Sequence, residues 1–180
     1  PMDAIALLAE AVGAIIVPAR NENAFAIAYR HTIPSWQWAT TTTTLELGDD
    51  LCWRLSGRFN PATQHNKIYV IGSTVGVGAT RQGTAGDTPA QTIVDALLTD
   101  ANAATERARQ ALSASGHRLE LSLECPLTPA AQAPGLIEPG RLVRLGDFSH
   151  AMTTGVSISA NWSEDSGLQI HQTVTLERAQ

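Results

Sequence analysis

The sequence predicts a mainly β chain that carries two helices. Hydrophobic residues recur at helical spacing in two segments, residues 3–12 and 99–115. Elsewhere apolar and polar residues alternate with a period of two, which is typical of strands with one solvated face. Turn-forming residues separate these strands at intervals of roughly ten residues, a spacing that favours a small barrel or sandwich.

The first helix is expected over residues 3–12, with Asp3 as its cap and Gly13 as its stop. A pair of strands, residues 14–17 and 24–30, follows it. The residues expected on the apolar face of the helix are Ile5, Leu8 and Val12.

The second helix is expected over residues 99–115, capped by Thr99 or Asp100 and ended by Gly116. Its apolar stripe is mostly alanine and comprises Leu97, Ala101, Ala104, Ala108, Ala111 and Leu112. Such small side chains allow a helix to lie close against a sheet or against another subunit.

The middle of the chain is expected to be largely extended. Five threonines, residues 40–44, form an extended connection that becomes a strand over residues 45–47, because β-branched residues favour extended backbone. Residues 51–55 and 67–72 are predicted strands, and the polar stretch 58–66 is predicted to be a surface loop.

From residue 118 onward the pattern is that of β-structure. Residues 119–125 alternate apolar and polar side chains, and residues 163–167 form a hairpin turn between two further alternating strands. Gln172 is the one interruption of the apolar pattern. The residues expected to point inward on these two strands are Val156, Ile158, Ala160, Leu168, Ile170, Val174 and Leu176.

The composition is that of a folded globular chain: of 180 residues, 43% are hydrophobic and 16% are charged. The net charge of −5 disfavours nucleic-acid recognition, which requires a basic patch. No apolar run approaches the roughly 18 residues of a membrane span, and no secretory signal peptide is visible. Cys52 and Cys125 lie far apart in strand-like surroundings, so we expect two buried free thiols.

No set of residues indicates catalysis, a metal or a cofactor. Residues 72–76 place their serine one position too early for a nucleophile elbow. Asp49 and Asp50 are neighbours in an expected turn, unlike the separated carboxylates of a glycosidase. The five histidines lack the helical or strand spacing of a metal site. We therefore predict no enzymatic activity and no cofactor.

Trp36 and Trp38 lie two positions apart and would share one face of an extended segment. Packing in the core is the simpler interpretation. The alternative is an aromatic platform on which sugar rings stack.

Residues 76–87, with the sequence GVGATRQGTAGD, form the most informative run of the chain. Its four glycines indicate a backbone that turns sharply or approaches another chain closely, because glycine reaches positive φ without a steric penalty. Arg81 and Asp87 can form an ion pair or stabilise the loop, or they can contact a neighbouring subunit. The candidate subunit-interface residues are therefore Arg81, Gly83, Gly86 and Asp87.

This glycine-rich run resembles a passage of bacteriophage tail hub proteins, VYVSG…GV…TR-GTAGD…DPLITD…ERGR. The likeness begins at residues 69–72 and continues through residues 95–100 and 106–109. Ala96 stands where the family has proline, and Ala108 where it has glycine.

Two further blocks resemble the same family in the same order. Residues 5–38 are similar to the passage AEAAG-vv-p…YPvaPW-W, although Ser35 separates the proline from the tryptophan. Residues 137–145, 155–159 and 172–178 are similar to the ending l-PG-LV-V…G-V-svs…v-QTL-LER. Family hubs are usually longer, so we expect a fragment of a longer hub or a reduced version.

The resemblance implies a subunit of the tail (baseplate) hub, related to the contractile-tail hub and to the base of the type VI secretion spike. It implies β-barrel-like tube domains, two per subunit, so that a homotrimer imitates the six-fold tail tube. The implied partners are other copies of the chain and the distal tail or tail-tube, tape-measure and tip proteins. The implied place is the virion tail, assembled in the host cytoplasm, where the hub joins the tube to the tip and the host-attachment apparatus.

Three segments are expected along the chain. Residues 1–36 form a helix and a strand pair that belong to a discontinuous hub β-domain. Residues 37–117 form a β segment with the glycine-rich loop and a helix, and residues 118–180 form a C-terminal barrel or sandwich. The alternative function is a carbohydrate- or receptor-binding β-module of a virion, from which the oligomeric state would distinguish a hub.

Overall fold

The structure is a computed structural model. It describes residues 2–19, 22–43, 45–51, 53–129, 132, 134–146, 150–164 and 167–179.

The contacts within the chain define two compact units, each built from two stretches of sequence. Unit 1 comprises Pro1–Ser35 and Thr63–Gly116, and unit 2 comprises Trp36–Ala62 and His117–Gln180. Residues 37–117 therefore contribute to both units.

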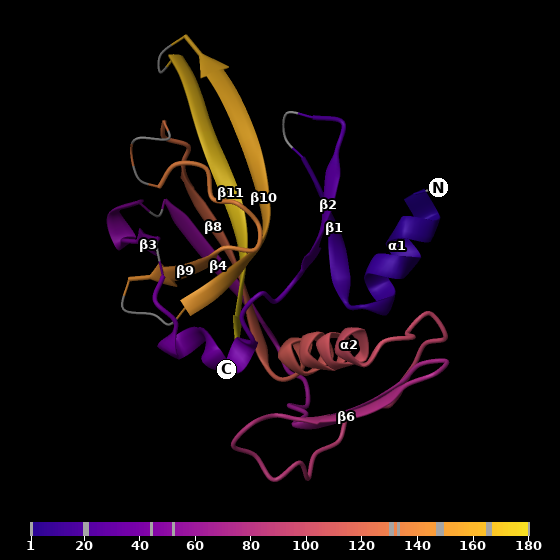
Figure 1. Cartoon of the computed structure of the whole chain (residues 1–180). Coiled ribbons are helices and arrows are strands. Elements are labelled where there is room, and N and C mark those ends of the chain that lie inside the picture. Colours follow the sequence, from indigo (N-terminus) through magenta and orange to yellow (C-terminus); the bar gives the residue numbers. More distant parts are fainter. Residues whose placement is uncertain are drawn as a thin grey trace. The chain divides into compact units, whose positions relative to one another are not determined.

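The N-terminal part of unit 1 is a helix followed by a β-hairpin (Figure 1). Helix α1 (Met2–Ala11) ends next to Gly13, whose φ of +72° lets the chain reverse. Strands β1 (Ala14–Pro18) and β2 (Phe25–Tyr29) then pair antiparallel. The predicted helix and strand pair are confirmed, but the helix begins at Met2, so Asp3 lies in its first turn rather than at its cap.

The second stretch of unit 1 is a three-stranded sheet with one helix packed on it. The central strand β5 (Lys67–Ile71) pairs antiparallel with β6 (Gly76–Thr80) and parallel with β7 (Ile93–Val94). Helix α2 (Ala101–Ala114) packs on β5 and β6. The first part of the glycine-rich run is thus a strand, and the turn begins after Thr80.

The cap of α2 follows from its sequence. A carboxylate oxygen of Asp100 accepts hydrogen bonds from the backbone N–H groups of Asn102 at 2.9 Å and Ala103 at 3.1 Å. Gly116, just beyond the helix, has a φ of +95°, which ends the helical path. The second predicted helix is therefore confirmed, with Asp100 as its cap.

Unit 2 is built on one six-stranded sheet. Its strand order is β3-β9-β10-β11-β8-β4, and all neighbours are antiparallel except β3 and β9. Two short 3-10 helices, η1 (Ser35–Thr40) and η2 (Asp49–Leu51), precede its strands β3 and β4 respectively. The strands are β3 (Glu46–Leu47), β4 (Arg54–Asn60), β8 (Arg118–Pro126), β9 (Leu142–Leu145), β10 (His150–Ser163) and β11 (Gly167–Ala179).

The core of unit 2 requires this sheet to curl. Leu123 on β8 and Val174 on β11 belong to the same buried cluster as Leu47 on β3 and Val143 on β9. Since strands from β3 to β8 contribute to one cluster, the sheet curls around its core as a half-barrel. The predicted mainly β, barrel-like fold is confirmed. Cys125 is a buried free thiol, as expected, and Cys52 lies outside the described residues.

Gln172 lies inside this core and does not break it. Its Oε1 accepts a hydrogen bond from the backbone N–H of Ile137 at 3.1 Å. Its Nε2 donates to the backbone carbonyls of Gly135 at 2.6 Å and Pro126 at 3.3 Å. A fully buried amide is tolerated because each polar atom has a partner, and the three bonds fasten the connection between β8 and β9 to the sheet.

Two local predictions in the first stretch of unit 2 are wrong. Residues 58–60, predicted as loop, belong to β4 and pair with β8. Residue 51, predicted as strand, lies in η2. The apolar alternation of β4 is hidden because Gly57 occupies its central position, and polar side chains cover its other face.

The strands β10 and β11 continue past their neighbours as a two-stranded hairpin (Figure 1). Within the described strands, β9 pairs with β10 over residues 150–152, and β8 pairs with β11 from His171 onward. Residues 158–163 therefore have β11 as their only neighbour among the described strands, and residues 167–170 have β10; we call these residues the arm. Part of its turn lies outside the described residues.

The arm corrects part of the predicted burial pattern. Val174 and Leu176 are buried as expected, near the centre of the sheet. Ile158, Ala160, Leu168 and Ile170 lie on the same side of the ribbon but are exposed, because no core element reaches that far in unit 2 as described. In the same way, Leu8 on α1 is exposed, contrary to the prediction.

Candidate subunit-contact site

The predicted contact residues lie in the loop between β6 and β7, and Asn66 holds this loop at both ends. The backbone carbonyl of Asn66 accepts from the N–H of Arg81 at 2.8 Å, and its N–H donates to the carbonyl of Thr88 at 3.0 Å. Its side-chain Nδ2 donates to Oδ1 of Asp87 at 2.8 Å, while its Oδ1 accepts from the N–H of Thr88 at 2.9 Å. One asparagine before β5 thus closes the loop.

Both glycines of the loop have left-handed backbone conformations, with φ of +78° at Gly83 and +70° at Gly86. A Cβ atom at Gly86 would also lie 3.0 Å from Cγ2 of Thr80, whereas a Cβ atom at Gly83 would have no neighbour within 4 Å. Glycine is therefore favoured at both positions by conformation, and at Gly86 by space as well.

The carboxylate of Asp87 is held in its charged form by its neighbours. The hydrogen bond from Asn66, the largest cause, lowers the pKa of Asp87 below its ordinary value of 3.8, and the hydroxyl of Thr88 adds to the effect. The side chain remains exposed to solvent. A fixed negative charge therefore stands on the surface of the loop.

The structure places all four candidate residues in this one loop. The carboxylate of Asp87 is bound by Asn66, which is the loop-stabilising contact that the sequence allowed as one alternative. The carbonyl of Arg81 accepts from the hydroxyl and the N–H of Thr84, at 2.6 Å and 3.2 Å. Asn66 was missed because it falls in a stretch predicted as an ordinary loop, although an asparagine directly before a strand is a turn-forming signal.

The alanine stripe of α2 faces the sheet of its own unit. Ala104 and Ala108 are fully buried, and α2 contacts β5 and β6. From the same helix, the side-chain amide of Gln110 binds the backbone N–H and the carbonyl of His31, both at 2.9 Å. Of the two neighbours that the sequence allowed for the stripe, the sheet is the one observed.

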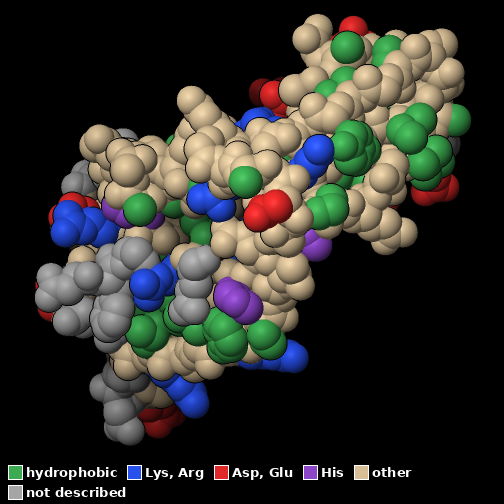
Figure 2. Space-filling view, turned by 90° about the horizontal axis from the view of Figure 1, so that it is seen from below, with side chains coloured by type: hydrophobic (Ala, Val, Ile, Leu, Met, Phe, Trp, Pro, Cys, Tyr) green, Lys and Arg blue, Asp and Glu red, His purple; other side chains and the backbone are tan. Residues whose placement is uncertain are grey.

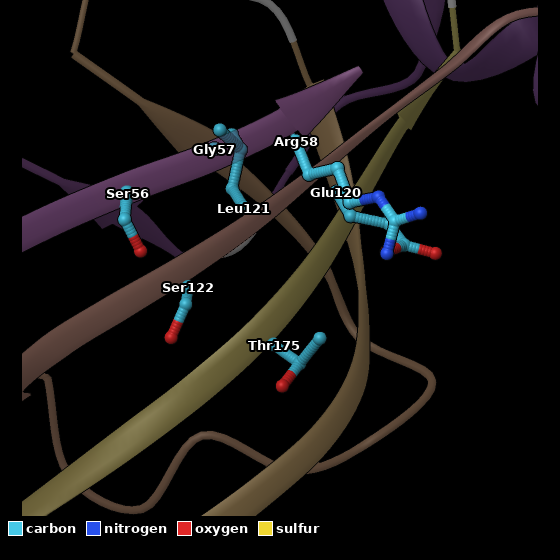
Figure 3. A pocket seen from close by; sticks show the side chains of 7 residues that line it. All are labelled: Ser56, Gly57, Arg58, Glu120, Leu121, Ser122 and Thr175. Carbon is cyan, nitrogen blue, oxygen red and sulfur yellow. The ribbon is translucent and has the colours of Figure 1, made fainter. Parts of the chain in front are cut away.

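A shallow hollow of about 240 Å³ lies over β4, β8 and β11 in unit 2. Ser56, Ser122 and Thr175 line it with hydroxyl groups, and Arg58 and Glu120 stand at one end (Figure 3). A serine becomes a nucleophile when an adjacent base activates it, and no histidine or lysine lines this hollow.

A second hollow of about 230 Å³ lies in unit 1, between the turn after α1 and helix α2. Its charged lining residues are Glu10, Arg30 and Arg107, and Gln110 at its wall is engaged with His31. Its lining includes no carboxylate pair.

Charged side chains are dispersed over the surface. On the face seen in Figure 2, Lys and Arg side chains are spread over the surface, some of them beside Asp or Glu side chains, and hydrophobic side chains reach the surface in several places. In the part of the chain that the structure describes, no three His, Cys, Asp or Glu side chains are grouped as a metal ion would require. The same residues include no helix with the length and hydropathy to cross a membrane.

The tryptophan pair does not form the sugar platform considered above. Trp36 and Trp38 lie in the 3-10 helix η1, where positions two apart point roughly 240° apart rather than to one face. Trp38 is buried, with the guanidinium of Arg118 5.7 Å from its ring centroid. The tryptophans that reach the surface are Trp53 and Trp162.

Comparison with known proteins identifies the fold. No protein-family model and no curated protein matches the chain. The 43 kDa tail protein of prophage MuSo2 from Shewanella oneidensis matches 98% of this chain with a TM-score of 0.54 and 17% sequence identity. The tail protein from Neisseria meningitidis MC58 matches 98% of it with a TM-score of 0.53 and 12% identity.

The chain spans about half the length of these two proteins, 51% and 54% respectively. Because the match runs through nearly the whole chain, both units share in it. The chain therefore has the fold of these phage tail proteins.

Proposed function

We propose that this chain is a structural component of a bacteriophage tail. The observation that carries the proposal is the fold match with two tail proteins over 98% of the chain. The three sequence blocks that resemble tail hub proteins support it independently, because that resemblance lies in the residues and not in the fold.

We further propose the baseplate or tail-tip hub as its position. There, a homotrimer would join the tail tube to the tip and the host-attachment apparatus, with tube, tape-measure and tip proteins as neighbours. The curled sheet supports this position, since barrel-like domains can line a tube. The proposed role is structural and not enzymatic, in keeping with two neighbours that are named for their place in a tail.

The loop closed by Asn66 is our proposed contact between copies. Its hydrogen bonds fix its shape in the single chain, so that little ordering is needed when a neighbour binds. Because Gly83 has no side chain, its backbone is exposed at the surface, and the carboxylate of Asp87 presents a negative charge there. Arg81 supplies a planar group with several donors in the same loop.

Inactivation of the gene in the phage that encodes this chain tests the proposal. We expect particles without functional tails, rescue by the wild-type gene, and density for the chain on the tail axis in images of rescued particles. Normal infectious tails without the gene would contradict the structural role. Binding of the isolated chain to a glycan array, lost on replacing Trp53 or Trp162, would favour the carbohydrate-binding alternative instead.

A further inference from the structure

We propose that the arm of one copy packs its apolar side against the edge of the sheet in a second copy. The receiving surface, here called the β4 margin, consists of Leu55 and Phe59 on the core side of β4, with Arg54 and Arg58 on the other side. The inference rests on the proposed function in one respect, since a hub is built from several copies of one chain.

The arm is an amphipathic ribbon whose apolar side is uncovered. The register pairs Trp162 with Leu168 and places both on the same side as Val174 of the core. Trp162 is 70% exposed, Leu168 64% and Ile158 53%. The opposite side of the arm carries the polar residues Ser159, Asn161 and Gln169. A two-stranded ribbon is at best marginally stable alone in water, so a partner on this side would stabilise it.

The β4 margin is the second uncovered part of the same sheet. Strand β4 ends the strand order, so one of its backbone edges has no neighbour among the described strands. Leu55 pairs with the core residue Leu123, which places Leu55 on the core side, yet Leu55 is 51% exposed and Phe59 50%. The core of the half-barrel therefore does not cover these two apolar side chains.

The charges of the two surfaces are complementary. Residues 150–163 and 167–176 of the hairpin contain no Asp, Glu, Lys or Arg, whereas the turn begins with the exposed acidic residue Glu164. On the β4 margin, Arg54 and Arg58 are exposed and lie opposite Glu124 and Glu120 of β8, although neither forms an ion pair with another described residue. Because β4 ends the strand order, the two arginines are outermost and the glutamates lie one strand further in. An uncharged ribbon with an acidic tip thus matches an apolar strand with basic flanks.

The area available favours another copy of this chain as the occupant. An exposed patch of a few large side chains offers several hundred Å², below the roughly 800 Å² per partner of a stable interface. A contact in which every copy both gives its arm and receives one uses two patches per copy. Such a head-to-tail contact is heterologous and closes into a ring when its rotation permits.

The test measures self-association of the purified full chain by sedimentation velocity over a dilution series. We expect the wild-type chain to form a species larger than the monomer. The double variant Trp162→Ser, Leu168→Ser should weaken this association about 30-fold or more, the effect of losing one strong contact residue. Val94→Ser is the matched control, because Val94 is 74% exposed but lies in unit 1 on β7. Circular dichroism of each variant verifies folding.

A charge exchange gives a second measurement that does not depend on removing apolar surface. Glu164→Arg alone and Arg58→Glu alone should each weaken association, and the two together should restore it. A monomeric wild-type chain, unchanged association in the arm variant, or equal loss in the control would each overturn the proposal. If the chain lies on the tail axis but the arm variant assembles normally, the arm contact is refuted and the proposed function is not. If the chain associates through its arm but is absent from tails, the proposed function is refuted and the arm contact is not.

Discussion

The side-chain amide of Asn66 donates a 2.8 Å hydrogen bond to the carboxylate of Asp87, 21 positions further along the chain. This contact joins the start of β5 to the end of the glycine-rich loop. It fixes the loop from within one chain, so that the loop is already shaped before any partner arrives.

The first prediction concerns the charge of Asp87. Replacing Asn66 with alanine should raise the pKa of Asp87 toward 3.8, because the hydrogen bond from Asn66 is the largest cause of its lowering. Since the pKa in the folded chain lies below the unfolded value, ionised Asp87 stabilises the fold above pH 3.8, and this contribution is lost as the pH falls through the folded pKa. NMR titration of the carboxyl group measures the shift, and Thr88→Val should give a smaller one. An unaltered titration in Asn66→Ala would contradict the argument.

The second prediction ranks the glycines of the loop. Gly83→Ala should cost about 1–2 kcal/mol, since alanine is strained at positive φ, and Gly86→Ala should cost more because its Cβ also meets Thr80. Gly76→Ala is the control: Gly76 lies in β6, has no positive φ and has open space around its Cβ position. Urea unfolding measures the change in the free energy of unfolding for all three variants. Equal losses at positions 83 and 86 would show that the contact of the added Cβ with Thr80 has no cost.

The third prediction concerns the buried amide of Gln172. Gln172→Leu keeps a similar volume but leaves the N–H of Ile137 and the carbonyl of Gly135 without their partner. We expect a loss of about 3 kcal/mol or more in the free energy of unfolding, because each buried unpaired group costs about 1–3 kcal/mol. Gln169→Leu, at an exposed position of the arm, should be nearly neutral for unfolding. A fully stable Gln172→Leu variant would mean that the connection after β8 is fastened by other contacts.

The fourth prediction contrasts two ion pairs of unit 2. Arg118 Nε lies 2.9 Å from Oε1 of Glu177 with both side chains about nine-tenths buried, whereas Arg144 Nη1 lies 3.1 Å from Oε1 of Glu46 at the surface. Arg118→Ala should cost about 3–5 kcal/mol, since it removes the guanidinium that lies 2.9 Å from the buried carboxylate of Glu177. Arg144→Ala should cost less than about 1 kcal/mol. Thermal or urea unfolding distinguishes them, and similar losses for both would refute the role of burial.

The fifth prediction tests the proposed loop contact. Arg81→Ala should leave the fold of the single chain intact but weaken assembly, since truncating one side of a buried charged contact costs roughly 2–5 kcal/mol. Complementation of a gene-deleted phage, with circular dichroism of the isolated chain, separates the two effects. Normal tail yield from Arg81→Ala would remove Arg81 from the contact.

Features set by neighbouring residues could be predicted from the sequence. Asp100 and Gly116 bound α2 because capping and positive φ are local properties of a few residues. The sequence also singled out the loop of Gly83 and Gly86, although its fastening by Asn66 depends on a contact across 21 positions.

Features set by distant contacts could not be predicted. Ile158 and Leu168 continue the same alternation as Val174, and the pattern alone cannot say where the core ends. Gln172 reads as a polar interruption because its three partners, Pro126 at the end of β8 and Gly135 and Ile137 in the connection to β9, lie far from it in sequence. Interleaving of the two units is equally invisible to local patterns, since it depends on which strands pair.

That interleaving sets the order in which the sheet of unit 2 can form during synthesis. Glu46 of β3 pairs with Arg144 of β9, which follows it by 98 residues. At a translation rate of about 5–20 residues per second, β3 leaves the ribosome roughly 5–20 s before its partner exists. During that interval Thr63–Gly116 emerges and completes unit 1. Strand β4, with Leu55 and Phe59, has no strand to pair with until β8 has been synthesised. The positive charges of Arg54 and Arg58 oppose premature pairing between the β4 edges of two nascent chains.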